Sequence, residues 1–162
     1  MAKKYVNPTK VVTGECRFSY ANLWEAKAMD ENSKPKYSVS LIIPKSDTKT
    51  IEKVKAAIQA AYDEGKSKLS NGKSVPSLNS IKTPLRDGDI DRPDDEAYAN
   101  SYFINANSII APGIVDADRQ PILEHSEIYS GIYGRASITF YAFNTKTSRG
   151  IACGLQNVQK LR

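Results

Sequence analysis

The sequence predicts a mainly β fold, a small and partly open antiparallel barrel of five to six strands with one amphipathic helix and long loops. Five or six stretches are rich in β-branched and aromatic residues and are bounded by turn residues. Only residues 47–69 have the periodicity of an amphipathic helix. A single helix cannot supply the crossovers of a parallel α/β sheet, so an antiparallel barrel is the better solution.

The 162 residues suit one domain. Residues 1–8 predict a flexible basic arm that ends at Pro8, and residues 9–162 predict the domain itself. No run of about 18 apolar residues occurs, so no transmembrane helix and no contact with a membrane are expected. The first ten residues carry lysines without a following apolar stretch, which excludes a signal peptide.

The N-terminal third predicts two strands separated by a loop. Residues 9–20 are rich in β-formers and indicate the first strand, and the polar residues 21–36 indicate a long loop. Residues 37–43 alternate, with apolar side chains on one face and serines on the other, and Pro44 ends this strand. The helix over 47–69 follows, with a cap at Asp47 or Thr48 and a weak point at Gly65.

The remaining residues predict a long loop and then mostly strands. Residues 70–100 read as loop, with turn signals at 71–72 and 87–88. Residues 101–110 predict a strand, which residues 111–113 break. Residues 114–122 predict a short strand and a turn. Residues 129–158 predict a long hairpin, with its first arm at 132–143 and its turn at 144–150.

The strand at 132–143 is the most informative for function. Its even positions are wholly apolar and predict a core face, because successive side chains of a strand point to opposite sides. Its odd positions carry an arginine, three aromatic residues and small hydroxyls: Tyr133, Arg135, Ser137, Thr139, Tyr141 and Phe143. Such a face suits single-stranded nucleic acid, because bases stack on aromatic rings and arginine neutralises phosphate. The alternative is that the helix or a loop covers this face and the aromatic rings are packing residues.

A second aromatic and basic cluster begins in the first strand. Arg17, Phe18, Tyr20 and Trp24 lie close together, and lysines follow at 27, 34 and 36. The aromatic face of this strand either belongs to the core or joins the binding surface at its outer end. Trp24 has a second interpretation, as a loop residue packed on the barrel.

The charge of the chain is a moderate signal for an anionic partner. Its net charge is +5, and residues 1–50 carry +4, residues 51–100 carry −1, and residues 101–162 carry +2. A solvated surface with a chance excess of lysine explains the same charges. The aromatic faces therefore have to distinguish a protein with an anionic partner from one without.

Nothing in the sequence indicates catalysis, a metal or a cofactor. Cys16 and Cys153 are far apart and predict buried thiols, and His125 predicts a surface or turn residue. The acidic stretch 87–96 has aspartates at alternate positions but lacks the glycine and glutamate of a calcium loop. We interpret it as a solvated acidic loop that keeps nucleic acid away from one rim. No nucleotide-binding glycine motif occurs.

Several stretches, taken in order, resemble a family of bacteriophage proteins that are regarded as single-stranded DNA-binding proteins. The resemblance covers about residues 9–160 and rests on an ordered set rather than on one motif. The set consists of RFSYANLWE at 17–25, YSVSLIIPKSD at 37–47, PLRDGDIDRPDDEAYANSYFINA at 84–106, PGIVDADRQPI at 112–122, YSGIYGRASITFYAFN at 129–144 and GIACGLQNVQK at 150–160.

The resemblance implies an OB-fold, a Greek-key barrel. It also implies a role in phage DNA replication or recombination, in the cytoplasm of the infected bacterial host, and no enzymatic activity. Replication or recombination proteins of the phage are then expected partners. Many replicative single-strand binders end in an acidic tail, whereas this chain ends NVQKLR. Either the protein lacks such a tail or the 162 residues are a shortened form.

The predicted function is sequence-independent binding of single-stranded DNA, which protects the strand. We predict Tyr133, Tyr141 and Phe143 as stacking residues and Arg135, Arg17, Lys34 and Lys36 as phosphate contacts. Tyr20, Trp24 and Tyr102 are further candidates, each of which also fits a core position. The alternatives are an RNA-binding module of the same fold, a structural phage protein whose aromatic face contacts protein, and a metal-dependent nuclease that uses the acidic loop.

Overall fold

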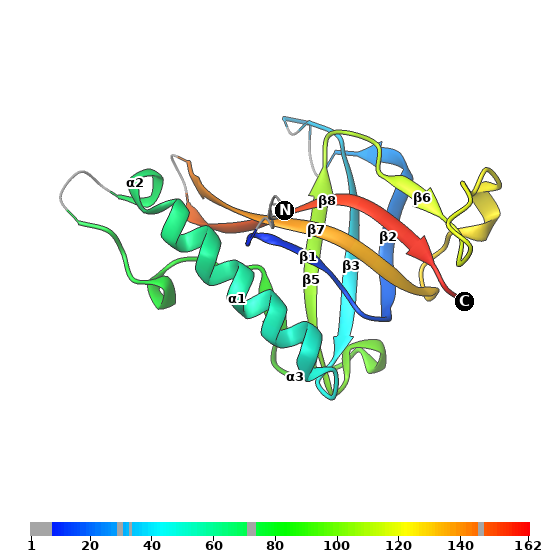
Figure 1. Cartoon of the computed structure of the whole chain (residues 1–162), viewed down its shortest axis with the longest axis horizontal. Coiled ribbons are helices and arrows are strands. Elements are labelled where there is room, and N and C mark those ends of the chain that lie inside the picture. The colour runs from blue at the N-terminus through cyan, green and yellow to red at the C-terminus, as the bar shows by residue number, and fades with distance from the viewer. Residues whose placement is uncertain (1–7, 29–30, 33, 71–73, 146–147) are drawn as a thin grey trace, which may run out of the picture.

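Figure 1 shows the computed structural model of the chain, which describes residues 8–28, 31–32, 34–70, 74–145 and 148–162. The predicted basic arm therefore lies outside the described residues except for Pro8. No helix in the described part of the chain is long and apolar enough to span a membrane.

Five strands form a closed barrel, and this confirms the predicted fold class. Around the barrel the order is β7, β2, β3, β5 and β8, and a β7–β8 pairing closes the ring. The pairs are antiparallel except β5–β8, which is parallel. This arrangement is that of an OB-fold, a five-stranded Greek-key barrel. The barrel strands are β2 (Cys16–Lys27), β3 (Lys36–Pro44), β5 (Ser101–Ser108), β7 (Tyr133–Asn144) and β8 (Arg149–Lys160).

Shorter elements attach to this barrel. Three short strands extend its sheet, namely β1 (Lys10–Val12) on β7, β4 (Leu85–Asp87) on β5 and β6 (Gly113–Val115) on β8. The helices are α1 (Thr48–Glu64), α2 (Lys66–Leu69) and α3 (Gly88–Asp91), with 3₁₀ turns at Leu78–Ser80, Glu96–Tyr98 and His125–Glu127. In Figure 1, α1 lies diagonally beneath the long β7–β8 hairpin.

The barrel interior is formed by the apolar faces that the sequence predicts. All even positions of the 132–143 strand are buried, from Ile132 to Ala142. They pack with inward residues of the other strands, such as Phe18, Leu41 and Ile104. The apolar side of α1 joins the same core. Removal of these side chains from water is the main stabilising contribution to the fold.

The predicted first strand is wrong in its extent. Residues 9–20 form parts of two strands, β1 and β2, and β2 continues to Lys27 through residues that we expected to be loop. The break lies where Gly14 meets the start of α1. Its N–H donates to Thr50 Oγ1 at 3.0 Å, and a Cβ at Gly14 would lie 2.8 Å from the Asp47 carboxylate. Asp47 itself caps α1, as predicted.

The predicted helix over 47–69 is broken at Gly65 into α1 and α2. A Cβ at Gly65 would collide with the side chain of Ala142 in β7, so close packing of the helix on the hairpin requires glycine here. The predicted loop over 70–100 contains the short elements β4, α3 and two 3₁₀ turns. Cys16 and Cys153 are buried free thiols, as predicted.

Candidate nucleic-acid interface

A groove of about 440 Å³ crosses the outer faces of β3 and β5. The register pairs Ser38 with Asn107 and Ser40 with Asn105, so small polar side chains form its floor. The inward neighbours Val39 and Ala106 belong to the core. The outer face of these two strands is the surface on which OB-folds bind oligonucleotides, and the loops after the first and fourth barrel strands flank it.

Tyr20 forms one wall of the groove. The β2–β3 register is irregular between Ser19 and Asn22, and Tyr20 has a φ of 48° in this bulge. The side-chain amide of Asn22 donates to the Tyr20 carbonyl at 3.3 Å and to Ser38 Oγ at 3.3 Å. The bulge leaves the Tyr20 ring 57% exposed at the groove rim, where a base can stack on it.

Arg92 lines the groove beside Tyr20. Its guanidinium carbon lies 5.4 Å from the ring centroid of Tyr20, 5.1 Å from that of Tyr98 and 5.3 Å from that of Phe103. Its Nε is buried and has no hydrogen-bond partner among the described residues. A cation held by aromatic rings and lining a groove is positioned to contact a phosphate or to stack on a base.

The acidic segment that carries Arg92 is fixed by its own carboxylates. Lys45 Nζ contacts Asp87 at 3.0 Å and Asp89 at 2.9 Å. The hydrogen bond from Lys45, and then the backbone N–H of Asn100, lower the pKa of Asp89. We expected this loop to keep nucleic acid away. Two of its carboxylates bind Lys45 and Arg92 lines the groove, and the exclusion of nucleic acid from one rim stays a prediction.

A small apolar cluster fixes the far end of this segment on the barrel. Ile42, Tyr98 and Phe103 pack together outside the barrel, and the Tyr98 hydroxyl lies 3.1 Å from Ser40 Oγ. The Tyr98 and Phe103 rings meet edge to face, with centroids 5.0 Å apart. Two of the three rings around Arg92, those of Tyr98 and Phe103, are therefore buried in the fold.

Lysines are concentrated at the base of the β2–β3 loop. Lys27 of β2 pairs directly with Lys36 of β3, and both are exposed, as is Lys34 in the loop. Like charges at directly opposed positions destabilise a sheet. An anion bound between them would remove this repulsion, so the pair is a candidate position for a phosphate.

Tyr141 lies on the continuation of the groove floor. Asn107 of β5 pairs with Gly154 of β8, and Gly154 pairs with Thr139 of β7, two residues before Tyr141. The Tyr141 ring extends over Gly154, because a Cβ there would lie 3.6 Å from its Cε1 atom. Tyr141 is 44% exposed, and burial of the rest of the residue raises the pKa of its hydroxyl.

Three other predicted residues lie at the two ends of β7. Arg17 pairs with Tyr133 where β2 meets β7, and the guanidinium carbon of Arg162 lies 4.4 Å from the Tyr133 ring centroid. Arg17 and Tyr133 extend the outer face of the barrel on the side of β2. Phe143 is half-buried near the tip of the hairpin, opposite Gly150.

The structure does not bring the last three predicted residues into the groove. Trp24 stacks on the ring of His125 at a centroid distance of 4.2 Å, and its Nε1–H donates to the His125 carbonyl. Tyr102 packs on the core between the ammonium groups of Lys45 and Lys55. Arg135 lines a separate cleft between β1, β7, β8 and β6.

Sequence reasoning missed Arg92 and the polar floor, and it named Lys27 in the basic cluster without predicting it as a contact. Arg92 stands in an acidic segment, and only the tertiary structure turns it towards Tyr20. The opposed lysines could have been found from a correct register of β2 and β3. The floor could not have been found without knowing which face of β5 is covered.

Comparisons with known proteins agree with this geometry. A family model described as "Enterobacter phage Enc34, ssDNA-binding protein" matches residues 9–162. The chain belongs to this family of phage single-stranded DNA-binding proteins. The family predicted from the sequence is thereby confirmed, and neither the RNA-binding nor the structural alternative is favoured.

Individual proteins are similar to this chain in sequence or in fold. "Putative protein p50" of Acyrthosiphon pisum secondary endosymbiont phage 1 is 29% identical over 159 residues, which cover 94% of this chain and 83% of that protein. The single-stranded DNA-binding protein of bacteriophage Enc34 in complex with ssDNA has a TM-score of 0.81 at 23% identity, over 98% of this chain and 92% of the other. Gp2.5 of bacteriophage T7, a single-stranded DNA-binding protein, has a TM-score of 0.66 at 16% identity, over 100% and 93% of the two chains.

Proposed function

We propose that this protein binds single-stranded DNA, independently of sequence, in the groove across β3 and β5. Family membership supports the ligand, and the Tyr20–Arg92 pair at the groove wall is the observation that supports the site. Bases would stack on Tyr20 at one end and on Tyr141 at the other, above the serine and asparagine floor. Stacking is available to every base, so this mode of binding requires no particular sequence.

Phosphates would contact the cations around the groove. Arg92 lies at its wall, and the lysines of the β2–β3 loop flank it. Arg17 and Tyr133 extend the outer face and would contact a longer strand. Arg135 and Phe143 remain sequence-based predictions at the margins of this path. The side chains of Trp24 and Tyr102 contact other residues of the protein.

The role follows from the mode of binding. A protein that covers bases and phosphates without reading sequence protects single strands during phage DNA replication or recombination. Such DNA lies in the cytoplasm of the infected host, so we place the protein there. The proposed chemistry consists of non-covalent contacts only and requires no catalytic group, metal or cofactor. Phage replication or recombination proteins are the proposed protein partners.

Fluorescence anisotropy of a labelled oligo-dT tests this proposal. We expect salt-sensitive binding, with a log–log slope of about −0.7 per neutralised phosphate, and weaker binding of a matched duplex, whose bases are paired. An RNA strand serves as competitor and separates the RNA-binding alternative. Absence of binding to oligo-dT at low salt would contradict the proposal.

Tyr20 provides the test of the site. Tyr20→Ala should weaken oligo-dT binding by about 5- to 150-fold, the range of one lost base stack, while leaving the salt slope unchanged. Tyr129→Ala is the matched control, because Tyr129 is also 57% exposed but does not line the groove. Equal affinities of the two variants would place the bases elsewhere.

A further inference from the structure

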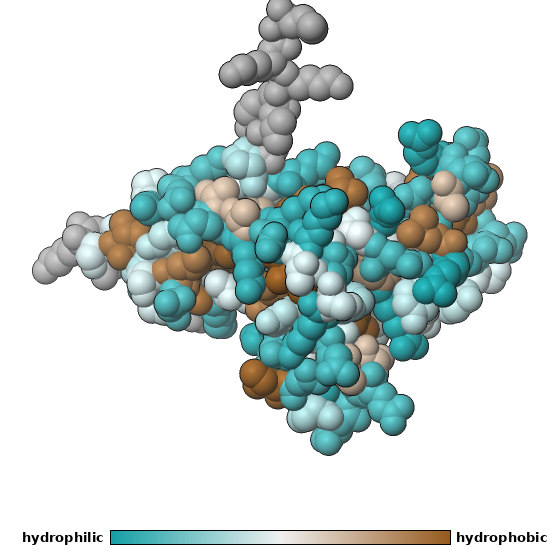
Figure 2. All heavy atoms as spheres, turned by 60° about the horizontal axis from the view of Figure 1, so that its bottom comes forward, coloured by the Kyte–Doolittle hydropathy of each residue, from teal (hydrophilic) through white to brown (hydrophobic). Residues whose placement is uncertain are grey.

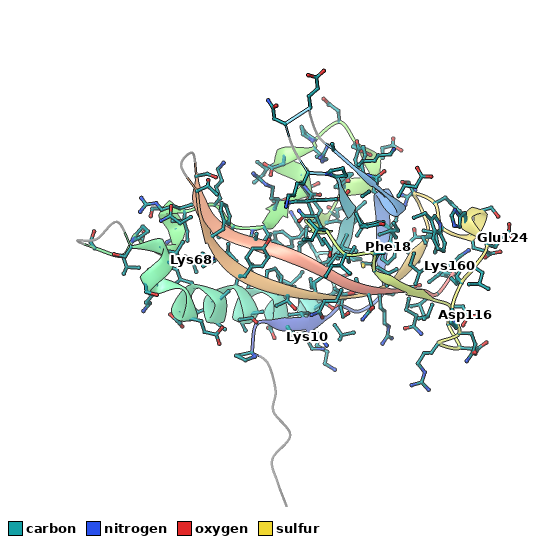
Figure 3. All side chains as sticks on the ribbon, turned by 90° about the horizontal axis from the view of Figure 1, so that it is seen from above. Lys10, Phe18, Lys68, Asp116, Glu124 and Lys160 are labelled. Atoms are coloured by element: carbon teal, nitrogen blue, oxygen red, sulfur yellow. The ribbon has the colours of Figure 1, made fainter. Side chains whose placement is uncertain are left out.

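A second concave site lies on another wall of the barrel, over the outer faces of β1, β7, β8 and β6. It is a cleft of about 210 Å³ and shares no lining residue with the groove. In Figure 3 the labelled Lys10 of β1 and Asp116, which follows β6, lie along the same lower side of the β7–β8 hairpin. Its principal lining residues are Val12, Val115, Arg119, Arg135, Ser137 and Asn157.

The wall that carries Arg119 is rigidly held. Asp116 Oδ1 accepts the backbone N–H groups of residue 118 at 2.9 Å and residue 120 at 3.0 Å, and the Arg119 N–H donates to the Asp116 carbonyl at 3.0 Å. From β8, the Gln159 amide donates to the carbonyls of Asp116 and Ala117 at 3.3 and 3.2 Å. This turn keeps Arg119 at a φ of 65°, a left-handed conformation that is unfavourable for arginine.

The other walls are equally well connected. Gly113 N–H donates to Asn157 Oδ1 at 3.1 Å, and the Asn157 N–H donates to Ser137 Oγ at 3.2 Å. These contacts tie β6, β8 and β7 together beneath the cleft. The site is therefore preformed, and a ligand would not need to order it.

The lining of the cleft combines aliphatic surface with two cations. Val12 is 51% exposed at its edge, and Val115 and Val158 also line it. Within the described part of the chain, neither Arg119 nor Arg135 forms an ion pair. None of the described residues that line the cleft is aromatic, so these residues offer no platform for stacking a base. Its volume is smaller than that of a typical small-molecule pocket and suits one bulky apolar side chain.

We propose that this site, the arginine cleft, binds an acidic peptide segment of a partner protein. An apolar side chain of the peptide would enter between Val12 and Val115, and neighbouring carboxylates would pair with Arg119 and Arg135. Charge complementarity selects an acidic partner, and the aliphatic lining selects a peptide over nucleic acid. Because the groove and the cleft share no lining residue, a partner docked here leaves the groove open. The inference goes beyond DNA binding and does not depend on it.

A peptide titration tests the arginine cleft in the full chain. The probe is a fluorescein-labelled peptide of sequence EDELLDEE, titrated by anisotropy with saturating oligo-dT present and absent. We expect saturable binding in both conditions and at least tenfold weaker binding of EDESSDEE, which has the same charge without the apolar side chains. Displacement of the peptide by oligo-dT would overturn the proposal, as would equal binding of the two peptides.

Two double variants make the test specific. Arg119→Asn with Val12→Asp removes one cation and the exposed aliphatic wall, and asparagine tolerates the left-handed conformation. We expect at least a tenfold loss of EDELLDEE binding with unchanged oligo-dT affinity. The matched control is Lys49→Asn with Val75→Asp, the same chemical change at exposed positions outside the cleft. Equal losses of peptide binding in both double variants would show that the loss comes from the change in net charge, and this would overturn the proposal.

Discussion

The guanidinium of Arg92 lies within 5.4 Å of three aromatic ring centroids, although its neighbours in sequence are aspartate and proline. The rings hold the cation at the groove and leave its Nε without a hydrogen-bond partner in the described structure. A buried polar group without a partner is costly, so holding Arg92 in this position reduces the stability of the fold. The proposed contact of Arg92 with DNA thus depends on the direction in which the three aromatic rings hold its side chain.

Replacing Arg92 should have a distinctive effect on binding. Arg92→Ala should weaken oligo-dT binding and reduce the magnitude of its salt slope by about 0.7, because one phosphate contact is lost. Arg86→Ala is the control, since Arg86 is a nearby exposed arginine that pairs with Asp91 at 3.3 Å. Anisotropy titrations at four salt concentrations measure both slopes. An unchanged slope in Arg92→Ala would remove Arg92 from the phosphate contacts.

The two thiols should be inert in the folded protein. Burial raises the pKa of Cys16 to about 12 and also raises that of Cys153. At pH 8 both thiols are neutral in the fold, so a disulfide reagent should react fast only after unfolding in denaturant. Rapid native-state labelling would contradict the burial.

The same raised pKa values predict an alkaline loss of stability. A thiol whose pKa is higher in the folded state than the unfolded value of 9.0 stabilises the fold fully below pH 9. As the pH rises above 9, the unfolded thiols ionise first, so the free energy of unfolding should fall. Urea unfolding at pH 8 and pH 10 measures this change, and a Cys16→Ala, Cys153→Ala variant should show less of it.

At the scale of elements, the β2–β3 hairpin carries an unfavourable charge pair. Its strands place Lys27 directly opposite Lys36 at the base of the loop that flanks the groove. Retaining like charges in this geometry costs stability and favours binding of an anion. The bulge at Tyr20 in β2 also combines a cost in stability with a feature that favours binding. A φ of 48° is unfavourable for tyrosine, but the bulge exposes the tyrosine ring.

Lys36→Gln should therefore change stability and binding in opposite directions. Without DNA, the melting temperature should rise slightly, because the repulsion between the strands is removed. Oligo-dT affinity should fall, with a salt slope smaller by about 0.7. Differential scanning fluorimetry and anisotropy measure the two effects, and Lys53→Gln on the exposed side of α1 is the control. A loss of both stability and affinity would contradict this interpretation.

At the scale of the whole molecule, closure of the barrel decides which surfaces remain for ligands. The β7–β8 pairing closes the ring of strands into a barrel. The groove and the arginine cleft lie on different sides of this barrel. Figure 2 shows that hydrophobic residues on the face it presents form separate patches among hydrophilic ones. A net charge of +5 favours encounter with anionic ligands over the whole surface.

Gly134 tests the closure directly. It lies where β7 pairs with both β2 and β8, and a Cβ would collide with the Gln159 carbonyl oxygen and approach the Phe18 ring. Gly134→Ala should lower the free energy of unfolding by about 1–3 kcal/mol, the usual cost of overpacking. Urea unfolding measures it, with Arg135→Ala at an exposed outer position of the same strand as control. A neutral effect would show that β7 and β8 can separate locally.

The sequence by itself determined the barrel, the family and the alternation of the 132–143 strand. Hydrophobic periodicity is a local property, and it correctly buried every even position from Ile132 to Ala142. It also selected Tyr20, which lines the groove, while the roles of Lys34, Lys36 and Tyr141 in binding stay predictions.

Only the tertiary structure decided how these residues combine. The break of the first strand at Gly14 depends on contact with α1, and the Arg92 cage depends on packing of the 88–100 segment on β3 and β5. The separation of Arg135 from the groove depends on closure of the barrel, because residues on one face of one strand can lie beside different neighbours. Contacts between distant segments set these features, and local sequence patterns do not encode them.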